Sequence, residues 1–152
     1  MSELRDLYQE VILDHAKRPR NFGPIAAPSH LAVGHNPLCG DKVTVFLTIA
    51  DDQILEARFE GAGCAISMAA ASLMTEAIKG KSADEARAIF ERFHVGLTVT
   101  DEAAAIGALA ELDKLAVFSG VREFPVRVKC ATLPWHTLVA ALNHVHEPVK
   151  TE

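Results

Sequence analysis

The sequence has no apolar run long enough to span a bilayer and no excess of positive charge. Its 152 residues include 15 Lys and Arg against 20 Asp and Glu, so the formal net charge is −5 with neutral histidines. Such a chain lacks the basic surface that nucleic-acid binding requires. The first residues, MSELRDLYQE, are charged from the third position and lack the apolar core of a secretory signal. We therefore expect a cytoplasmic protein that binds neither membranes nor nucleic acid.

Cysteine is also scarce, and its spacing excludes the familiar small zinc modules. The chain has three cysteines, Cys39, Cys64 and Cys130, and no Cys-x-x-Cys pair. Three thiols cannot all pair within one chain, and thiols stay reduced inside cells. The cysteines lie too far apart in the sequence for a zinc finger. Each is therefore a buried small residue, a nucleophile or a metal ligand.

What the sequence does contain is helical periodicity towards both ends and strand periodicity between them. Helices are predicted at residues 3–16, at about 64–79, from Ser82, from Asp101 with Ile106, Leu109, Leu112 and Leu115 on one face, and from Pro134 onward. Strands are predicted at residues 31–35, 43–49 and 55–59. This order is not a βαβ alternation, so we expect one α+β domain over residues 1–152, with a small antiparallel three-stranded sheet packed against several helices.

The seven histidines carry no obvious ligand pattern. His15 lies in line with the apolar face of the first predicted helix, so we expect a partly buried side chain with a hydrogen-bond partner. His144 and His146, near the end of the chain, are expected to be solvated.

Each cysteine lies beside a glycine or a cation. Cys39, within NPLCGD, is one glycine from Asp41, and in an extended segment two such side chains point the same way. Cys64 follows Gly-Ala-Gly and opens a predicted helix, whose amino-terminal dipole favours a thiolate. Cys130 follows two nearby cations that also favour a thiolate. This context, outside the apolar stripes, supports a shared metal site, but three ordinary buried thiols and a turn residue at Asp41 remain open.

At these residues the sequence resembles a known family. The segments that carry the resemblance are VILDHAKRPRN, NPLCGD, FEGAGCAISMAAAS and VRVKCATLPW. They are similar, over nearly the whole chain, to the iron–sulfur cluster assembly family with the IscU/NifU amino-terminal fold, and most of all to its SufU-type branch. The resemblance implies a compact α+β domain whose metal ligands are Cys39, Asp41, Cys64 and Cys130 at one exposed end.

The SufU-type resemblance also implies an activity. Its members hold zinc at this site and accept sulfur from a SufS-type cysteine desulfurase, with downstream iron–sulfur assembly proteins or apo-proteins as recipients. Cys39 matches the usual sulfur acceptor, and Arg127 matches an arginine that this branch places near the metal, so both are candidate catalytic residues. The basic residues Lys17, Arg18 and Arg20 are implied as a docking surface for the desulfurase.

Three departures from the IscU-type pattern favour the SufU-type branch. Lys129 stands where many IscU-type members have histidine, EFPVR at 123–127 replaces the chaperone-binding LPPVK run, and the segment before the third cysteine is longer. Three functions remain open: a zinc-dependent sulfur acceptor, a scaffold that builds and transfers a [2Fe–2S] cluster, and a structural zinc module. A carboxylate ligand speaks against the third, because purely structural sites favour Cys and His.

Overall fold

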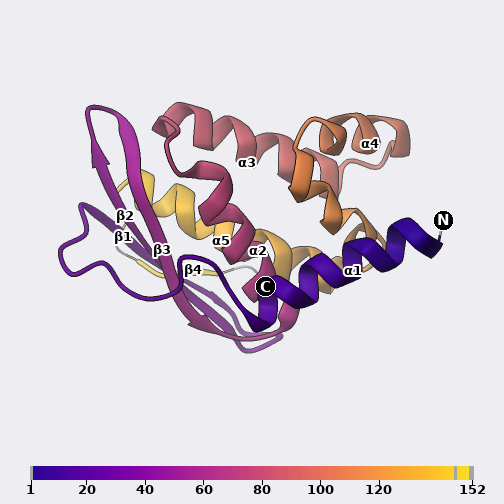
Figure 1. The fold of residues 1–152 in the computed structure, drawn as a ribbon, viewed down its shortest axis with the longest axis horizontal. Helices are drawn as coiled ribbons and strands as arrows, with labels where there is room; N and C mark the ends of the chain where they lie inside the picture. The colour runs from indigo at the N-terminus through magenta and orange to yellow at the C-terminus, as the bar shows by residue number, and fades with distance from the viewer. Residues whose placement is uncertain (1, 146, 151–152) are drawn as a thin grey trace.

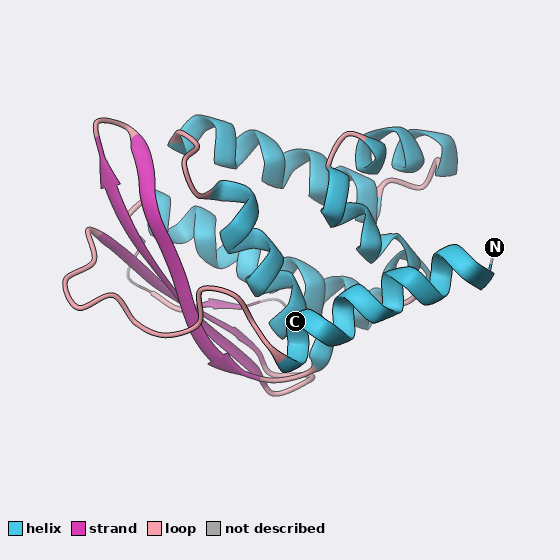
Figure 2. Cartoon of the chain, viewed as in Figure 1, coloured by secondary structure: helices cyan, strands magenta, loops and turns pink. Residues whose placement is uncertain are grey.

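The computed structural model describes residues 2–145 and 147–150, with side chains from Arg5 onward, so His146 lies outside the described residues. Figure 1 follows the chain from indigo to yellow and Figure 2 separates helices from strands. The elements are α1 (Ser2–Lys17), β1 (His30–Asn36), β2 (Asp41–Ala50), β3 (Gln53–Ala62), α2 (Ala65–Ile78), α3 (Ala83–Thr98), α4 (Glu102–Ala110), the 3₁₀ helix η1 (Asp113–Glu123), α5 (Pro125–Leu142) and β4 (Val149–Lys150). Within the described residues, no helix combines the length and apolar character that crossing a bilayer requires.

The sheet has the strand order β3-β2-β1-β4. β2 pairs antiparallel with both β1 and β3, and β4 pairs parallel with β1. The β2–β3 hairpin turns at Asp51 and Asp52, whose φ angles of 52° and 62° suit a two-residue hairpin turn. The α+β class and the three antiparallel strands are therefore confirmed. The fourth strand was not predicted, since two residues are too few to show an alternating pattern.

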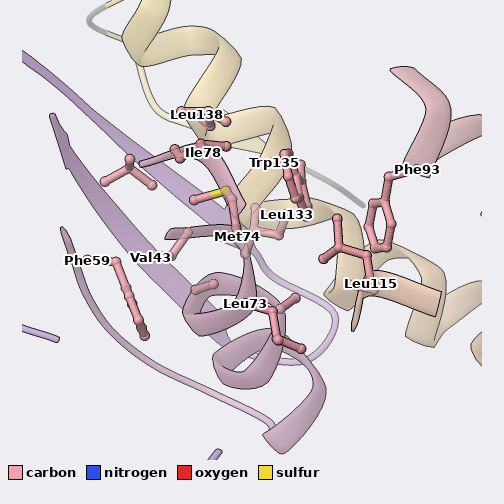
Figure 3. Packing of buried hydrophobic residues seen from close by; sticks show 14 of the residues in the cluster. Val43, Phe59, Leu73, Met74, Ile78, Phe93, Leu115, Leu133, Trp135 and Leu138 are labelled. Atoms are coloured by element: carbon pink, nitrogen blue, oxygen red, sulfur yellow. The ribbon is translucent and has the colours of Figure 1, made fainter. Parts of the chain in front are cut away.

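One face of the sheet carries the core. Along β2, Val43, Val45 and Leu47 are fully buried, while Thr44 and Thr48 on the other face are half-buried. α2 and α5 contact the strands directly, and α3 and α4 lie on the side away from the sheet (Figure 1). Figure 3 shows apolar side chains from β2, β3, α2, η1 and α5 meeting around this interface, with Phe93 of α3 beside Trp135.

The last helix begins at Pro125 rather than near Pro134. Pro125 occupies the first turn, where a backbone N–H has no carbonyl acceptor within the helix, so the missing N–H of proline costs nothing. Pro134 lies inside the helix and cannot donate to the carbonyl of Cys130, four residues earlier. The predicted helix start near Pro134 is therefore wrong. Cys130 consequently lies within α5 and is only 2% exposed, so the expectation that it falls outside a buried face is wrong.

The helix predicted after Asp101 ends at Ala110 and does not reach Leu115. Asp113, with φ at 54°, takes a left-handed conformation that an α-helix cannot include. Leu109 and Leu115 are buried, but Ile106 is 63% exposed, so the predicted single apolar face is wrong.

Two histidine expectations are confirmed. His15 is 5% exposed, and its Nδ1 lies 2.7 Å from the hydroxyl of Ser72 on α2. This contact, with the packing of α1 on α2, holds the first helix against the core. His144 is exposed and stacks on His30 with the ring centroids 4.2 Å apart.

Candidate metal centre

The four predicted ligands come from four places that meet at one end of the sheet. Asp41 begins β2 and pairs with Asn36 at the end of β1, so the turn carrying Cys39 lies at this end. Lys42 pairs with the last residue of β3, which places the following α2 helix and its cap, Cys64, at the same end (Figure 2). Cys130 reaches the site from the second turn of α5.

Three of the four predicted ligands lie within the range of one cation, and the fourth, Cys64, lies beside Asp41. One ligand atom from each of Cys39, Asp41 and Cys130 lies within 4.8 Å of the other two. The Sγ atoms of Cys39 and Cys130 are 3.4 Å apart, and Cys64 Sγ lies 3.7 Å from Asp41 Oδ2. Four ligands at tetrahedral corners around zinc, with Zn–S near 2.3 Å, have edges of about 3.8 Å. The donor set of Cys39, Asp41 and Cys130 is therefore compatible in both chemistry and spacing with a zinc-sized ion, whereas Cys64 lies outside this group of three.

Asp41 is oriented by its position in the strand. It shares the inward face of β2 with Val43 and is fully buried. Its Oδ1 accepts the backbone N–H of Cys64 at 2.8 Å, which leaves Oδ2 directed at the Cys64 sulfur. Gly63, with φ at 156°, makes this approach possible, because a Cβ there would lie 2.9 Å from the Cα of Asp41 and would overlap its carboxylate.

Cys64 caps α2, as predicted from Gly-Ala-Gly and the helix that follows. Its Sγ accepts the backbone N–H of Ser67 at 3.4 Å. The pKa of Cys64 is lowered to about 7, chiefly by a hydrogen bond from the Cys130 thiol and further by the Ser67 N–H, against burial and the Asp41 charge. The lowered pKa of Cys64 agrees with the helix-dipole argument.

The pKa of Cys130 is raised, whereas its cationic neighbours in the sequence led us to expect a lowered pKa. The hydrogen bond to Cys64 is the largest factor that raises the pKa of Cys130, and burial together with contacts to Asp41 and Cys39 raises it further. The predicted preference for a thiolate at Cys130 is therefore wrong for these four groups by themselves. A cation among them would reverse this, since metal binding displaces the thiol protons.

Exposure differs sharply among the three sulfurs. Cys39 is exposed, Cys64 is half-buried and Cys130 is buried. Residues 37–40 form a turn with Gly40 at a φ of 73°, so residues 39–41 are not the extended segment in which the two side chains would point the same way. This turn places Cys39, beside the 62% exposed Leu38, where a partner protein can reach it.

Arg127 lies in the first turn of α5, exposed, with its guanidinium carbon 4.6 Å from the centre of the Phe124 ring. Within the described residues, no ion pair joins Arg127 to Asp41. Lys129, next to Cys130, is half-buried. The predicted role of Arg127 near the metal stays a prediction.

Sequence reasoning overlooked one side chain at this site. Asn36 is fully buried, and its Nδ2 donates to Cys130 Sγ at 3.7 Å. Its Oδ1 accepts the backbone N–H of Leu38 at 3.2 Å. An asparagine side chain that accepts the backbone N–H two residues later is a recognised turn signal, so NPLCGD indicates the turn. It does not indicate the hydrogen bond from Asn36 to the Cys130 sulfur.

Comparison with known proteins agrees with the motifs. The family model described as NifU-like N terminal domain matches residues 7–131. The zinc-dependent sulfurtransferase SufU of Bacillus subtilis is 39% identical over 137 residues, covering 90% of this chain and 90% of that protein. The iron–sulfur cluster assembly scaffold protein IscU of Streptococcus pyogenes is 36% identical over 143 residues, covering 94% of this chain and 87% of that protein.

The fold agrees as well. The crystal structure of FiSufU from Fervidobacterium islandicum AW-1 superposes with a TM-score of 0.77 at 36% sequence identity, covering 88% of this chain and 94% of that one. The family match spans most of the residues, including all three cysteine motifs, and the relatives are alike over nearly their full lengths. On this evidence the chain belongs to the NifU-like N-terminal domain family.

Proposed function

We propose that this protein acts in iron–sulfur cluster assembly as a zinc-dependent sulfur acceptor. In this proposal Cys39, Asp41, Cys64 and Cys130 hold Zn²⁺, and Cys39 receives sulfur from a SufS-type cysteine desulfurase. The single observation that carries it is the meeting of Cys39, Asp41 and Cys130 within 4.8 Å of one another, with Cys64 beside Asp41 and only the sulfur of Cys39 exposed. A reducing, cytoplasmic setting belongs to the proposal, because the three thiols must stay reduced to act.

The donor set suits zinc. Zinc accepts thiolate and carboxylate ligands in tetrahedral geometry and, when bound, keeps thiolates deprotonated without redox chemistry. Cys64 and Cys130 are the inner ligands, each held by a helix, and Asp41 is held by the Cys64 amide. Cys39 lies on a turn at the surface and is the ligand whose position can change most easily.

The transfer step needs only chemistry that a thiolate performs. The Cys39 thiolate attacks the terminal sulfur of a persulfide on the desulfurase, forming a new S–S bond while the old one breaks. The desulfurase cysteine leaves as a thiolate, and Cys39 becomes the persulfide. No electrons are gained or lost overall, so no oxidant or reductant is required. An exposed Cys39 is the prerequisite, since two protein surfaces must bring the sulfurs into contact.

Two further groups belong to the proposal. Arg127, three residues before Cys130 in α5, would stabilise the negative charge on sulfur during transfer. Replacing Arg127 with Lys would keep the positive charge but lose the planar guanidinium and its paired donors, whereas replacing it with Ala would remove both the charge and the donors. In the basic segment, Lys17 is exposed, whereas Arg18 and Arg20 pair with Asp14. The segment remains the proposed docking surface for an acidic patch of the desulfurase.

A scaffold on which a [2Fe–2S] cluster is built is the second candidate. It is supported by the scaffold relative of similar identity and by a ligand set that suits such a cluster equally well. Lys129, which replaces the histidine of many IscU-type members, is the sequence feature that favours the sulfur acceptor instead.

The deciding experiment combines metal analysis with desulfurase turnover. The protein is purified without oxygen, its metal content is measured, and a SufS-type desulfurase is assayed with and without it. Stoichiometric zinc, a large rise in turnover and a mass gain of one sulfur on Cys39 support the proposal. An iron–sulfur absorption spectrum with cluster handover to an apo-protein supports the scaffold. Zinc without any effect on turnover refutes both in favour of a structural zinc module.

A further inference from the structure

Asn36 is a buried polar side chain in a row of small residues. The inward positions of β1 are Ala32, Gly34 and Asn36, and the last of these is fully buried. α5 packs closely here, since a Cβ at Gly34 would overlap the hydroxyl of Thr137. An unsatisfied amide in such a place costs about 1–3 kcal/mol, so its hydrogen-bond partners decide whether it is tolerated.

Those partners lie on two different elements. The Asn36 Oδ1 accepts the backbone N–H of Leu38 at 3.2 Å, and its Nδ2 donates to Cys130 Sγ at 3.7 Å. The orientation of the amide is fixed by chemistry, because a backbone N–H can only donate and must face the oxygen. The nitrogen therefore faces the sulfur. The backbone carbonyl of Asn36 also accepts the N–H of Gly40 at 2.9 Å, which closes the same turn.

The turn held in this way carries Cys39 between Leu38 and Gly40. The Asn36 side chain therefore binds both parts of the site. Its oxygen accepts a hydrogen bond from the exposed turn that carries Cys39, and its nitrogen donates one to the buried sulfur of Cys130 in α5. The two sulfurs joined through it are 3.4 Å apart although they lie 91 residues apart in the chain. We infer that Asn36 is a positioning residue that holds the Cys39 turn against Cys130 so that both sulfurs reach one metal ion. The inference rests on the proposed metal site, and it adds Asn36 as a residue that orients two of the proposed ligands.

Two variants distinguish the effects of the two hydrogen bonds that the Asn36 side chain makes. Asn36→Ala removes both hydrogen bonds, whereas Asn36→Asp keeps an oxygen for the Leu38 N–H and places a second oxygen against the sulfur. Outer residues that orient metal ligands typically change affinity 10–100-fold when mutated. We expect Asn36→Ala to lower zinc affinity within that range, measured by competition with a chromophoric chelator. With Co²⁺ as the probe, the sulfur-to-cobalt charge-transfer band should weaken in both variants.

A second readout needs no metal. In a Cys64→Ala background with chelator present, diamide can oxidise Cys39 and Cys130 to a disulfide, taking up the two electrons and two protons. We expect this bond to form severalfold more slowly after Asn36→Ala, because the turn no longer keeps the sulfurs adjacent. Mass spectrometry identifies the linked peptides. Should Asn36→Ala fail to fold, Asn36→Asp carries the test through zinc affinity and the cobalt band, since it keeps the turn but loses the hydrogen bond to Cys130.

Thr137→Val is the matched control. Thr137 is also fully buried at the β1–α5 contact, and its hydroxyl donates to the Leu133 carbonyl at 2.8 Å, away from the sulfurs. The Thr137→Val variant should be less stable, but its zinc affinity and the rate at which Cys39 and Cys130 form a disulfide should be unchanged. Folded Asn36 variants with unchanged affinity and unchanged disulfide rate would overturn the inference, as would an equal loss in Thr137→Val. Sulfur acceptance by the unmodified protein tests the proposed function separately, so the two can fail independently.

Discussion

Gly63→Ala should disable the proposed metal centre although it replaces none of the proposed ligands. Gly63 lies between β3 and α2, and the Cβ introduced by alanine would overlap the carboxylate of Asp41. To make room, Asp41 must move away from the Cys64 backbone N–H, which it now accepts at 2.8 Å. The substitution therefore acts on both Asp41 and the amino-terminal cap of α2.

The expected cost has two parts. A hydrogen bond to a charged group contributes about 1.5–3 kcal/mol, and a φ of 156° in a residue with a Cβ costs of the order of 1–3 kcal/mol. Together they predict a loss of about 2.5–6 kcal/mol in the free energy of unfolding. For a chain of this size each kcal/mol shifts Tm by about 2–4 °C, so Tm should fall by about 5–25 °C.

The assay is thermal unfolding with chelator present, followed by zinc competition at a temperature where the variant is folded. Gly107→Ala is the control, because no atom lies within 4 Å of a Cβ at that position in α4. It should raise stability by up to about 1 kcal/mol, since alanine favours the helix. A Gly63→Ala protein with unchanged Tm and unchanged zinc affinity would refute the view that Asp41 is held in place by this close approach.

Three further predictions concern the acceptor, the first helix and acid stability. Cys39→Ser should keep its Tm within a few degrees, because the side chain is exposed, yet gain no sulfur in a mass-spectrometric transfer assay; full transfer would contradict the assignment of the acceptor. Ser72→Ala should cost about 1–3 kcal/mol in urea unfolding, since it leaves the buried ring of His15 and the Arg20 amide without their hydroxyl partner, and an unchanged midpoint would argue against this contact. Burial lowers the pKa of three histidines, so below about pH 6.5 each binds a proton less readily in the folded than in the unfolded chain. These are His15, His30 and His136. Stability should be complete above pH 6.5 and decline as the pH falls below it, and a His15→Gln variant should show a shallower decline in urea midpoints between pH 7.5 and 5.5; equal slopes would exclude His15 as a contributor.

The local patterns of the sequence determined much of this protein. Strand alternation located the β2–β3 hairpin, because side-chain burial there follows a strict period of two. Gly-Ala-Gly followed by apolar residues of helical period located Cys64 at the start of α2. The family motifs identified the ligand candidates, and the capping box at Ser82 and Glu85 is present as expected.

The tertiary structure decided what local patterns cannot express. Two prolines nine residues apart in α5 look alike in sequence, and only packing showed that Pro125 opens the helix and that Cys130 is thereby buried. The order of ionisation of Cys64 and Cys130 follows from contact between residues distant in the chain, which reversed the expectation drawn from adjacent cations. The contact of Asn36 with Cys130 exists only because β1 and α5 lie side by side. Sequence fixes local conformation through neighbouring residues, whereas hydrogen bonds, burial and shared protons depend on distances that exist only in the folded chain.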